Sequence, residues 1–536
     1  MKNYLISVGG TGAKCLEAFV HMNAMGLLKN PGDVKIIYVD PDASNGNLDK
    51  AKNAVAAYVN AFRGAAQQET FFKNGLAPEK TTWNPVPTGS ATNLRSIFDR
   101  ANMDVKEPGL DFLFDTLFSE EEQNTLLTEG FRAHPAIGAA VIGANMNLDE
   151  DGSVWQKMVN DIGEQEARIF FFGSVFGGTG AAGFPNIAKI IRKYFDDKAA
   201  NNNPDRTDIK KDGKIKMGGC LMLPYFTFPK ATEKDMFDAD GQRIIVPDSG
   251  KFFASTYAAL NYYNTSNLVG DVFDAVYLLG DKQLVSMDKY KPGRAEQKNK
   301  AHFIEMFAAL AACEFFNKNA KDSYFDEANC YMTALLDDKL TWDDFPPVAD
   351  GSKITAKIKT FIRMAYMFRS QVFPKLKECY EDNKKFKDNP WIEGYLHDVQ
   401  TVKKLGLFSS EKDIAFISDD NYEILQAFDR YCINFMDWLK DFTYSEVSTP
   451  LRGDRLVNPD IFNYDDNRSL EDNLRSMDGN RVVSPENMFM DKTNTTFDGG
   501  ENNFLQQMTN SNAEADGVKP LIAKVYDICK DGKEVE

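Results

Sequence analysis

Two glycine-rich turns of nearly the same sequence constrain this chain more than any other feature. Val8-Gly9-Gly10-Thr11-Gly12 and Phe176-Gly177-Gly178-Thr179-Gly180 each follow an apolar run typical of a strand and precede apolar residues at helical spacing. A glycine turn between a strand and a helix lets backbone N–H groups approach an anion, and the positive end of the helix adds attraction. Two such turns predict a site for the phosphate chain of a nucleotide.

The first half of the chain alternates between strand and helix patterns. The clearest expected strands are residues 4–8, 35–39, 168–175, 216–224 and 273–279, and helices are expected at 13–25 and 181–194. This alternation predicts an α/β fold with a doubly wound, mainly parallel sheet. The polar stretch from Asp40 to Gly130 is interpreted as a long surface insertion with helices at 46–62 and 94–101.

The second half has a mostly helical pattern. Residues 298–317 are apolar around nearly the whole circumference, which predicts a central helix buried between two bodies. Further helices are expected at 354–380, 391–405 and 421–442, and a short one at 519–529. Residues 445–517 are rich in Asn, Asp, Ser and Gly, which favours extended loops, an arm that wraps a protein partner, or partial disorder.

These patterns together predict four regions along the chain. Residues 1–297 form a nucleotide-binding domain and residues 298–320 form the central core helix. Residues 321–444 form a largely helical C-terminal α+β domain, and residues 445–536 form a polar arm or tail that ends in a short helix.

Charge and cysteine usage exclude several classes of function. The chain has 79 acidic and 62 basic residues among 536, a net charge of −17, which disfavours nucleic acid and anionic lipid as partners. The seven cysteines lie far apart without a CxxC pair, as expected for reduced thiols in a cytoplasmic protein. No apolar stretch of about 18 residues occurs, so membrane insertion is not expected. The four histidines are scattered, without a metal or nucleophile constellation.

Neither turn meets every requirement of the two commonest phosphate-binding motifs. The second turn has the spacing Gly178-x-Gly180-x-x-Gly183 of a dinucleotide fold, but no strand that ends in an acidic residue follows it. A P-loop requires a lysine and a hydroxyl residue after its last glycine, whereas Ala13 follows Gly12. A dinucleotide fold requires a third glycine where Cys15 stands, although Asp40 ends the second expected strand, where a ribose-binding carboxylate belongs. An NAD-binding enzyme of the Rossmann type therefore remains an alternative.

Six segments, in order over more than half of the chain, resemble the tubulin/FtsZ superfamily of GTPases. They are Ser7 to Gly12 and Val39 to Asp42 (first and second phosphate loops), Gly130 to Gly138 (third loop), Gly177 to Gly180 with Pro185 (signature loop), CLMLPYFTF and FDAVYLLGDKQL. Residues 298–317 then fall where the family has its central helix. Phe176 and Ala182 replace glycines of the signature loop.

The resemblance implies which residues bind GTP or GDP with Mg²⁺. Backbone amides of the first and fourth loops would hold the phosphates, at Gly9, Gly10, Thr11, Gly12, Gly177, Gly178, Thr179 and Gly180. Arg132 would add a cation beside the terminal phosphate, and Asp40 or Glu233 would replace the ribose-binding glutamate of the family. Asn299, His302 and Phe303 fall where the base-binding residues lie, although an aromatic residue on a buried helix is also ordinary core. Lys14 would either reach a phosphate or lie on a helix surface.

The resemblance also implies GTP hydrolysis that is completed across a filament interface. Acidic residues after the central helix of one subunit would orient the attacking water in the next, which points to Asp322 and Asp326, with Asp343 and Asp344 as the alternative pair. Ordinary solvated acids explain both pairs equally well. The expected function is a GTP-binding protein that self-associates head to tail into cytoskeletal filaments. A nucleotide-gated scaffold that does not polymerise is the alternative of another class.

Overall fold

The computed structural model divides the chain into two compact units. It describes residues 1–29, 32–42, 44–64, 70–87, 89, 92–127, 130–131, 134–202, 213–230, 232–233, 248–281, 284–287, 298–318, 329–332, 351–404, 410–441, 501–510 and 517–530. The first unit comprises residues 1–19, 28–52 and 76–338, and the second comprises 20–27, 53–75 and 339–536. The division falls within two helices, α1 (Gly9–Ala24) and α2 (Gly46–Gly64), and assigns the central helix to the first unit.

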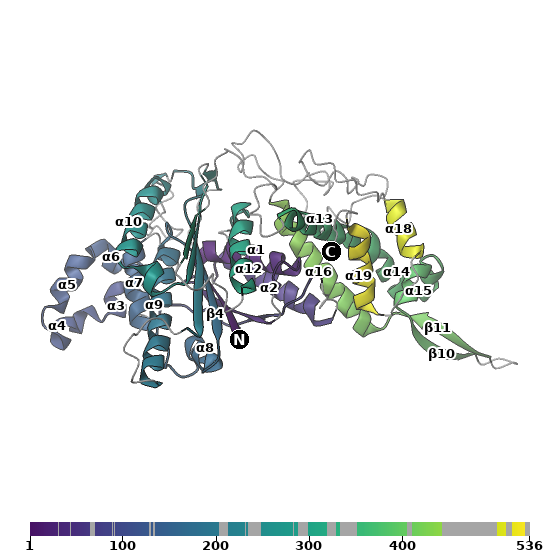
Figure 1. The fold of residues 1–536 in the computed structure, drawn as a ribbon, viewed down its shortest axis with the longest axis horizontal. Helices are drawn as coiled ribbons and strands as arrows, with labels where there is room; N and C mark the ends of the chain where they lie inside the picture. The colour runs from purple at the N-terminus through teal and green to yellow at the C-terminus, as the bar shows by residue number, and fades with distance from the viewer. Residues whose placement is uncertain are drawn as a thin grey trace. The chain divides into compact units, whose positions relative to one another are not determined.

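A sheet of seven parallel strands organises the first unit (Figure 1). Its order is β3-β2-β1-β4-β5-β7-β9, the doubly wound arrangement in which the winding direction reverses between β1 and β4. The strands are β1 (Lys2–Val8), β2 (Val34–Val39), β3 (Leu76–Pro78), β4 (Ala167–Ser174), β5 (Ile215–Met222), β7 (Ala275–Leu279) and β9 (Asn329–Met332). The predicted α/β fold with a mainly parallel sheet is confirmed.

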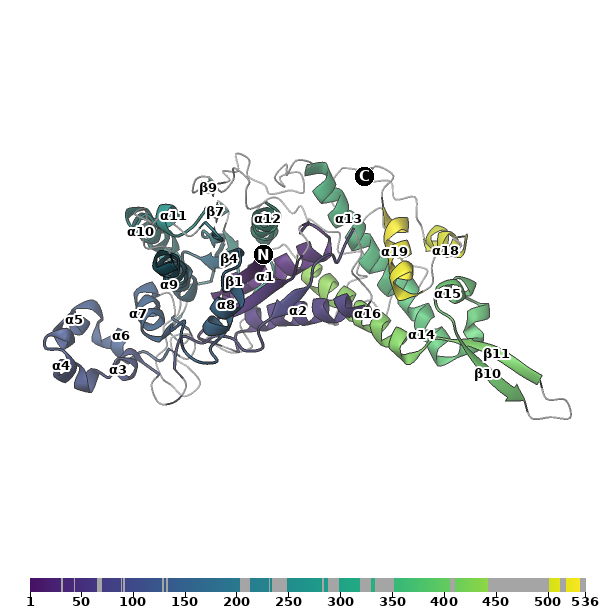
Figure 2. The same ribbon diagram turned by 60° about the horizontal axis from the view of Figure 1, so that its bottom comes forward.

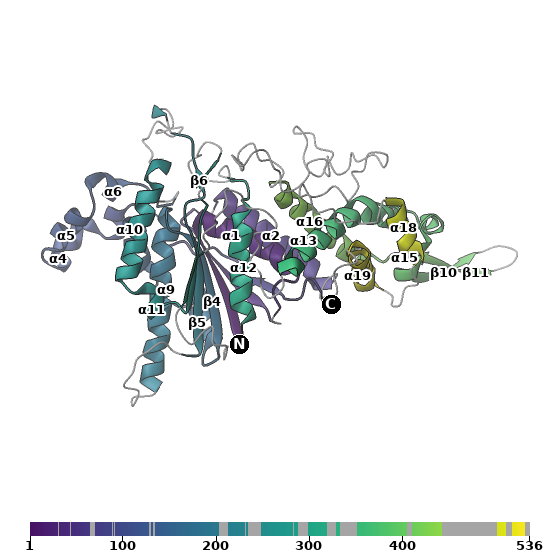
Figure 3. The same cartoon turned by 45° about the horizontal axis from the view of Figure 1, so that its top comes forward.

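Helices cover both faces of this sheet (Figure 3). Alternate residues of β4 point to opposite faces. The Phe171 ring lies 5.9 Å from that of Phe184 on α9 (Gly178–Asn202), whereas the Phe172 ring lies 6.4 Å from that of Phe19 on α1. Phe170 packs at 5.3 Å against Phe315 of α12 (Ile304–Asn317), on the same face as α1. Residues Ile169 to Phe172 of the strand are therefore all apolar, because both faces of the sheet are covered there.

A buried arginine ties α9 to the sheet. The Arg192 guanidinium donates to Asp274 at 2.9 Å, and also to the carbonyls of Val272 and Ile215, each at 3.0 Å. The Asp274 carboxylate in turn accepts from the backbone N–H of Met217 at 2.7 Å. One paired charge thus satisfies backbone groups around β5 and β7.

Residues 94–127 of the first unit form a small helical lobe (Figure 2). Its helices are α3 (Leu94–Ile97), α4 (Met103–Lys106), α5 (Leu110–Leu117) and α6 (Glu120–Asn124), with a 3₁₀ turn at Arg100–Asn102. Phe98, Phe114 and Phe118 pack together inside the lobe. The expected insertion from Asp40 to Gly130 therefore joins the hydrophobic core of the first unit through Phe114 and Phe118, and it also contributes β3 to the sheet.

The helices that follow the lobe complete the first unit. They are α7 (Pro135–Asn145), α8 (Val154–Ile162), α10 (Phe252–Thr265) and α11 (Leu268–Asp271), and the short strands β6 (Phe226–Thr227) and β8 (Val285–Ser286) pair in parallel. The central helix begins at Ile304, so the expected start at residue 298 is wrong by about one and a half turns. Among the described residues, no helix is both long and apolar enough to cross a membrane.

The second unit is mostly helical and has an aromatic core. It contains α13 (Gly351–Met367), a π-helical turn at Phe368–Val372, α14 (Phe373–Glu381), α15 (Pro390–Tyr395), α16 (Asp419–Lys440), α18 (Glu501–Asn510) and α19 (Val518–Cys529). The Tyr58 and Phe72 rings stack at 4.7 Å within this unit, and the Tyr431 ring lies 4.8 Å from Phe72 in a T-shaped arrangement. The His21 ring is 3.0 Å from the Tyr431 hydroxyl.

Two predictions for the second unit need correction. The expected helix at 391–405 is wrong, because α15 ends at Tyr395 and β10 (Asp398–Lys404) pairs with β11 (Ser410–Phe416) as an antiparallel hairpin. Val399, Thr401 and Val402 favour a strand once a partner strand is available. Within the polar stretch 445–517, residues 501–510 form a helix, and the rest lies outside the described residues except Gly517.

Candidate functional site

Both glycine turns open onto one pocket at the carboxyl edge of the sheet. The first turn follows β1 and the second follows β4, the two strands between which the winding direction reverses. A β-carbon added to Gly9 would lie 3.2 Å from the β-carbon of Thr179. The lining residues are Val8, Gly9, Gly10, Thr11, Asp40, Asn45, Asn47, Gly130, Phe131, Ser174, Phe176, Gly177, Gly178, Thr179, Gly180, Phe226, Phe228, Phe252 and Asn299. Doubly wound folds bind ligands at this switch point.

Two long helices begin at this pocket. Helix α1 starts at Gly9 and α9 starts at Gly178, in the two turns that line it. The first N–H groups of an α-helix lack acceptors inside the helix, and the dipole gives that end a partial positive charge. Two helix starts at one pocket therefore make a strong anion site out of main-chain atoms, with no need for lysine.

The glycines of the turns have two different roles. Gly9 has a φ of +73°, which most side chains rarely adopt. A β-carbon at Gly12 would lie 2.7 Å from the Phe172 carbonyl oxygen, and one at Gly180 would lie 2.6 Å from the Ser174 nitrogen. Gly12 and Gly180 are thus needed for close packing of a helix on a strand, and Gly12 is not among the residues that line the pocket.

Polar residues from three loops line the pocket. Asp40 follows β2, Asn45 and Asn47 open α2, and Asn299 precedes the central helix. The Asn47 carboxamide oxygen accepts from the Asn299 backbone N–H at 2.7 Å, so two loops distant in sequence are joined there. These residues offer carboxamide and carboxyl groups suited to hydrogen bonding with a sugar, and the carboxamides can also donate to a phosphate.

Asp40 is the one charged side chain among the described residues that line the pocket. It is buried, and its carboxylate accepts from the backbone N–H of Asp42 at 2.9 Å. Burial raises the pKa of Asp40 to about 7, because the charged form loses water. Glu233, the alternative candidate for a ribose contact, is exposed and does not line the pocket.

Four of the phenylalanines that line the pocket lie close to one another, and we call them the aromatic wall: Phe176, Phe226, Phe228 and Phe252. The Phe176 ring lies 5.3 Å from that of Phe226 and 4.9 Å from that of Phe252, and the Phe226 and Phe228 rings are 5.4 Å apart. Sequence reasoning treated Phe176 only as a replaced glycine and missed the wall. The alternating phenylalanines of Tyr225-Phe226-Thr227-Phe228 were the available signal.

His302 and Phe303 do not reach the pocket. Both are buried, and the His302 ring accepts from the Ile304 N–H at 3.1 Å, where it caps the start of the central helix. Burial, followed by the charge of Lys14, lowers the pKa of His302 to about 3, so the ring is neutral. The ordinary core interpretation fits these two residues, whereas Asn299 does line the pocket.

Lys14 is neither a phosphate ligand nor a surface lysine in this structure. Its ammonium lies 2.6 Å from Glu305 of the central helix, and both side chains are buried. The same carboxylate oxygen accepts from the Tyr225 hydroxyl at 2.7 Å, and the Lys14 ammonium lies 5.4 Å from the centre of the Tyr225 ring. This ion pair links the helix of the first turn to the central helix and to the base of the aromatic wall.

Three predicted site residues lie outside the described residues: Arg132, Asp322 and Asp326, as does the alternative pair Asp343 and Asp344. Gly130 and Phe131, which precede Arg132, do line the pocket. The remaining predicted phosphate-binding positions, Gly10, Thr11, Gly177, Gly178 and Thr179, all line it.

The donor set of the pocket fits a nucleotide and a magnesium ion that is held mainly through phosphate oxygens. Mg²⁺ bound in this way needs one or two carboxylates and otherwise uses phosphates and water, and Asp40 is such a carboxylate. Among the described residues, no group of three or more His, Cys, Asp or Glu side chains is arranged to hold a metal by itself.

No protein-family model matches the chain, and no curated protein matches it in sequence. The function is therefore inferred from the geometry of the pocket and from the motifs in the sequence.

Proposed function

We propose that this chain binds a nucleoside triphosphate in the pocket between the two glycine turns, with GTP as the first candidate and with Mg²⁺. One observation carries the proposal: Gly9 of the first turn and Thr179 of the second are in contact, so both helix starts line one pocket. The partial charges of two helix ends suit a ligand with several negative charges.

The pocket contains both hydrogen-bond donors and aromatic rings, which favours a nucleoside phosphate over inorganic phosphate as the ligand. The glycine turns, Thr11 and Thr179 provide donors for phosphate oxygens, whereas the aromatic wall provides faces on which a planar base can stack. Bound Mg²⁺ would neutralise phosphate charge. The residues of this chain hold the phosphates with main-chain amides and exclude water with phenylalanine rings.

An NAD-binding enzyme is the second candidate, and one observation favours it. Asp40 lies directly after β2 and lines the pocket beside the first turn, the location of the ribose-binding acid in dinucleotide folds. The second glycine turn argues against it, because a dinucleotide fold holds its pyrophosphate on the first turn alone.

Hydrolysis and filament assembly rest on the resemblance to tubulin and FtsZ. In this proposal the chain stacks head to tail, and Asp322 and Asp326 of one subunit orient the water that attacks the terminal phosphate bound by the next. A nucleotide-gated scaffold without polymerisation is the alternative. Pelleting that depends on GTP and not on GDP supports filaments, and its absence at every protein concentration supports the scaffold.

The binding proposal is tested by identifying the ligand. The purified chain is denatured, and the released nucleotide is identified by chromatography and mass spectrometry; added fluorescent GTP is then titrated into the emptied protein. Gly10→Asp puts a carboxylate beside the phosphates and is expected to weaken binding at least about tenfold. Gly143→Asp is the matched control, since Gly143 is exposed on α7 and nothing lies within 4 Å of its added β-carbon. Release of NAD, or equal binding by both variants, would overturn the GTP proposal.

The hydrolysis proposal needs its own test. Asp322→Ala and Asp326→Ala are expected to abolish phosphate release while the affinity for GTP stays the same. Turnover at the wild-type rate in both variants would reject the assignment of these two residues and leave the binding proposal intact.

A further inference from the structure

Helix α5 of the helical lobe has two apolar faces, of which one is buried. Phe114 and Phe118 point into the lobe and are buried. On the other face, Phe112 is 76% exposed, Leu113 is 50% exposed and Leu117 is 60% exposed. Val105 on α4 is 84% exposed. We call the three exposed residues of α5, Phe112, Leu113 and Leu117, the outer apolar face. Exposed apolar side chains gathered in this way mark interaction sites.

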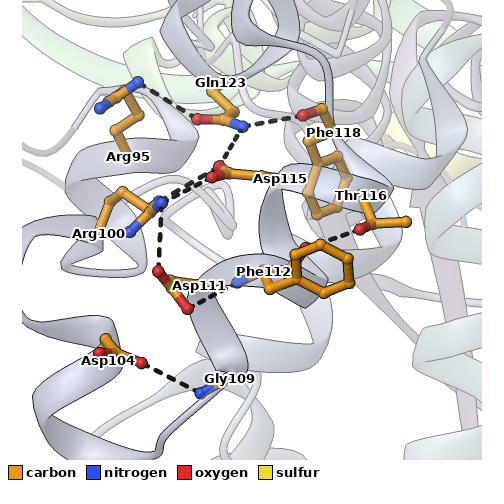
Figure 4. A network of polar contacts seen from close by, with 10 residues as sticks. All are labelled: Arg95, Arg100, Asp104, Gly109, Asp111, Phe112, Asp115, Thr116, Phe118 and Gln123. Carbon is orange, nitrogen blue, oxygen red and sulfur yellow. Dashed lines mark hydrogen bonds and ion pairs between the residues drawn. The ribbon is translucent and has the colours of Figure 1, made fainter.

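The lobe holds this face in a defined geometry. The Arg100 guanidinium donates to both oxygens of Asp115, at 2.7 and 3.4 Å, and lies 3.9 Å from Asp111 (Figure 4). The carboxamide of Gln123 donates to the same Asp115 at 2.9 Å and to the Phe118 carbonyl at 2.8 Å. Figure 4 shows this network on the helix that also bears Phe112. Helix α5 is therefore anchored before any partner binds, which reduces the entropy lost on binding.

The lobe around the outer apolar face is acidic. Residues 94–127 contain eight acidic and three basic residues. Arg100, one of the three, is already paired with Asp115 and Asp111. The acidic side chains Glu107, Glu120 and Glu121 are exposed. A partner that buries the apolar residues must therefore approach through a negative potential, which favours a basic one.

We propose that the outer apolar face binds a basic amphipathic helix of a partner protein, which inserts apolar residues at i, i+3, i+4 and i+7 spacing between Phe112 and Leu117. The negative charge of the lobe favours a basic helix over a second copy of this chain or an anionic lipid surface. A symmetric contact between two copies would bring two acidic lobes together, and an anionic lipid surface would be repelled as well. This binding site is separate from the nucleotide pocket and does not depend on what the pocket binds.

The test uses a synthetic peptide and the full-length chain. A labelled peptide of about 18 residues, with Leu on one helical face and Lys on the other, is titrated by fluorescence anisotropy. Phe112→Ala/Leu117→Ala is expected to weaken binding at least about tenfold, and alanine keeps the helix propensity of α5. Tyr257→Ala is the matched control, because Tyr257 is 77% exposed on α10 and should bind no part of the peptide. Circular dichroism checks that each variant is folded.

Further measurements distinguish the contributions of charge and of sequence pattern to peptide binding, and they test for self-association. Glu107→Gln/Glu120→Gln/Glu121→Gln is expected to weaken binding and to reduce its salt dependence. A scrambled peptide of the same composition and a peptide with Glu for Lys should bind at least about tenfold more weakly than the Leu/Lys helix. The proposal fails if the wild type does not bind the Leu/Lys peptide, if the double variant binds it equally, or if the scrambled peptide matches it. It also fails if sedimentation velocity shows a wild-type dimer that the double variant loses, since a second copy would then cover this face.

Discussion

Gly9 and Thr179, far apart in the sequence, lie against each other where the first and second glycine turns meet. A β-carbon on Gly9 would be 3.2 Å from that of Thr179 and 3.4 Å from the backbone nitrogen of Gly180. The contact brings the starts of α1 and α9 to one pocket, and it leaves almost no room for a larger residue at position 9. The first prediction follows from this lack of room.

Gly9→Ala is expected to lower the free energy of unfolding by about 2–3 kcal/mol, because a positive φ costs about 1–2 kcal/mol and the methyl group crowds Thr179. Gly152→Ala separates the two causes, since Gly152 has a φ of +76° and nothing within 4 Å of its added β-carbon. It should cost only about 1–2 kcal/mol. Urea denaturation measures both. Equal losses would show that the crowding at Thr179 has no energetic effect.

Lys14→Met is expected to destabilise the fold by about 3 kcal/mol, because it leaves the buried carboxylate of Glu305 without its counter-charge. Adding Glu305→Gln should restore most of the loss. Lys193→Met is the control, since it removes an exposed ion pair with Asp197 one helical turn away and should cost less than about 0.5 kcal/mol. Equal losses in the Lys14 and Lys193 variants would argue against a buried ion pair.

Asp40→Asn is expected to change how stability depends on pH. Burial raises the pKa of Asp40 to about 7, whereas an unfolded aspartate ionises near pH 4. Between these values the folded chain keeps a proton that the unfolded chain has lost, so the free energy of unfolding falls as pH rises through that window. Asp40→Asn removes the ionisable group, so the free energy of unfolding of the variant does not decrease in this way. Its gain over the wild type, without ligand, should grow to on the order of 4 kcal/mol by pH 8. Urea denaturation at several pH values checks this, and a gain that is constant with pH would contradict it.

Phe228→Ala is expected to weaken nucleotide binding about tenfold, because the half-buried ring is part of the aromatic wall on which a base would stack. Inorganic pyrophosphate, which has no base, should bind the variant and the wild type equally. Isothermal titration calorimetry measures both ligands. Tyr257→Ala, on an exposed part of α10, should change neither affinity. A parallel loss for pyrophosphate would mean that Phe228 supports the phosphate site instead.

Much of the first unit was predictable because its signals are local. The strands that end at Val8 and Val39 were expected from apolar runs, and the two glycine turns were expected to start helices. Hydrophobic period and turn residues act within a few positions, so they can be read directly from neighbouring residues. The short β3 and the hairpin of β10 and β11 were not predicted. Their residues form strands only when a neighbouring strand pairs with them.

From the sequence alone one can predict two strand–glycine–helix units in an α/β fold and a strongly acidic chain. The folded arrangement was needed to show that the two turns share a pocket, that His302 lies in the core, that Lys14 pairs with Glu305 and that phenylalanines line the same pocket. Periodicity and turn chemistry depend on adjacent residues. Strand order, burial and the pKa of a group such as Asp40 depend instead on what distant segments bring beside it.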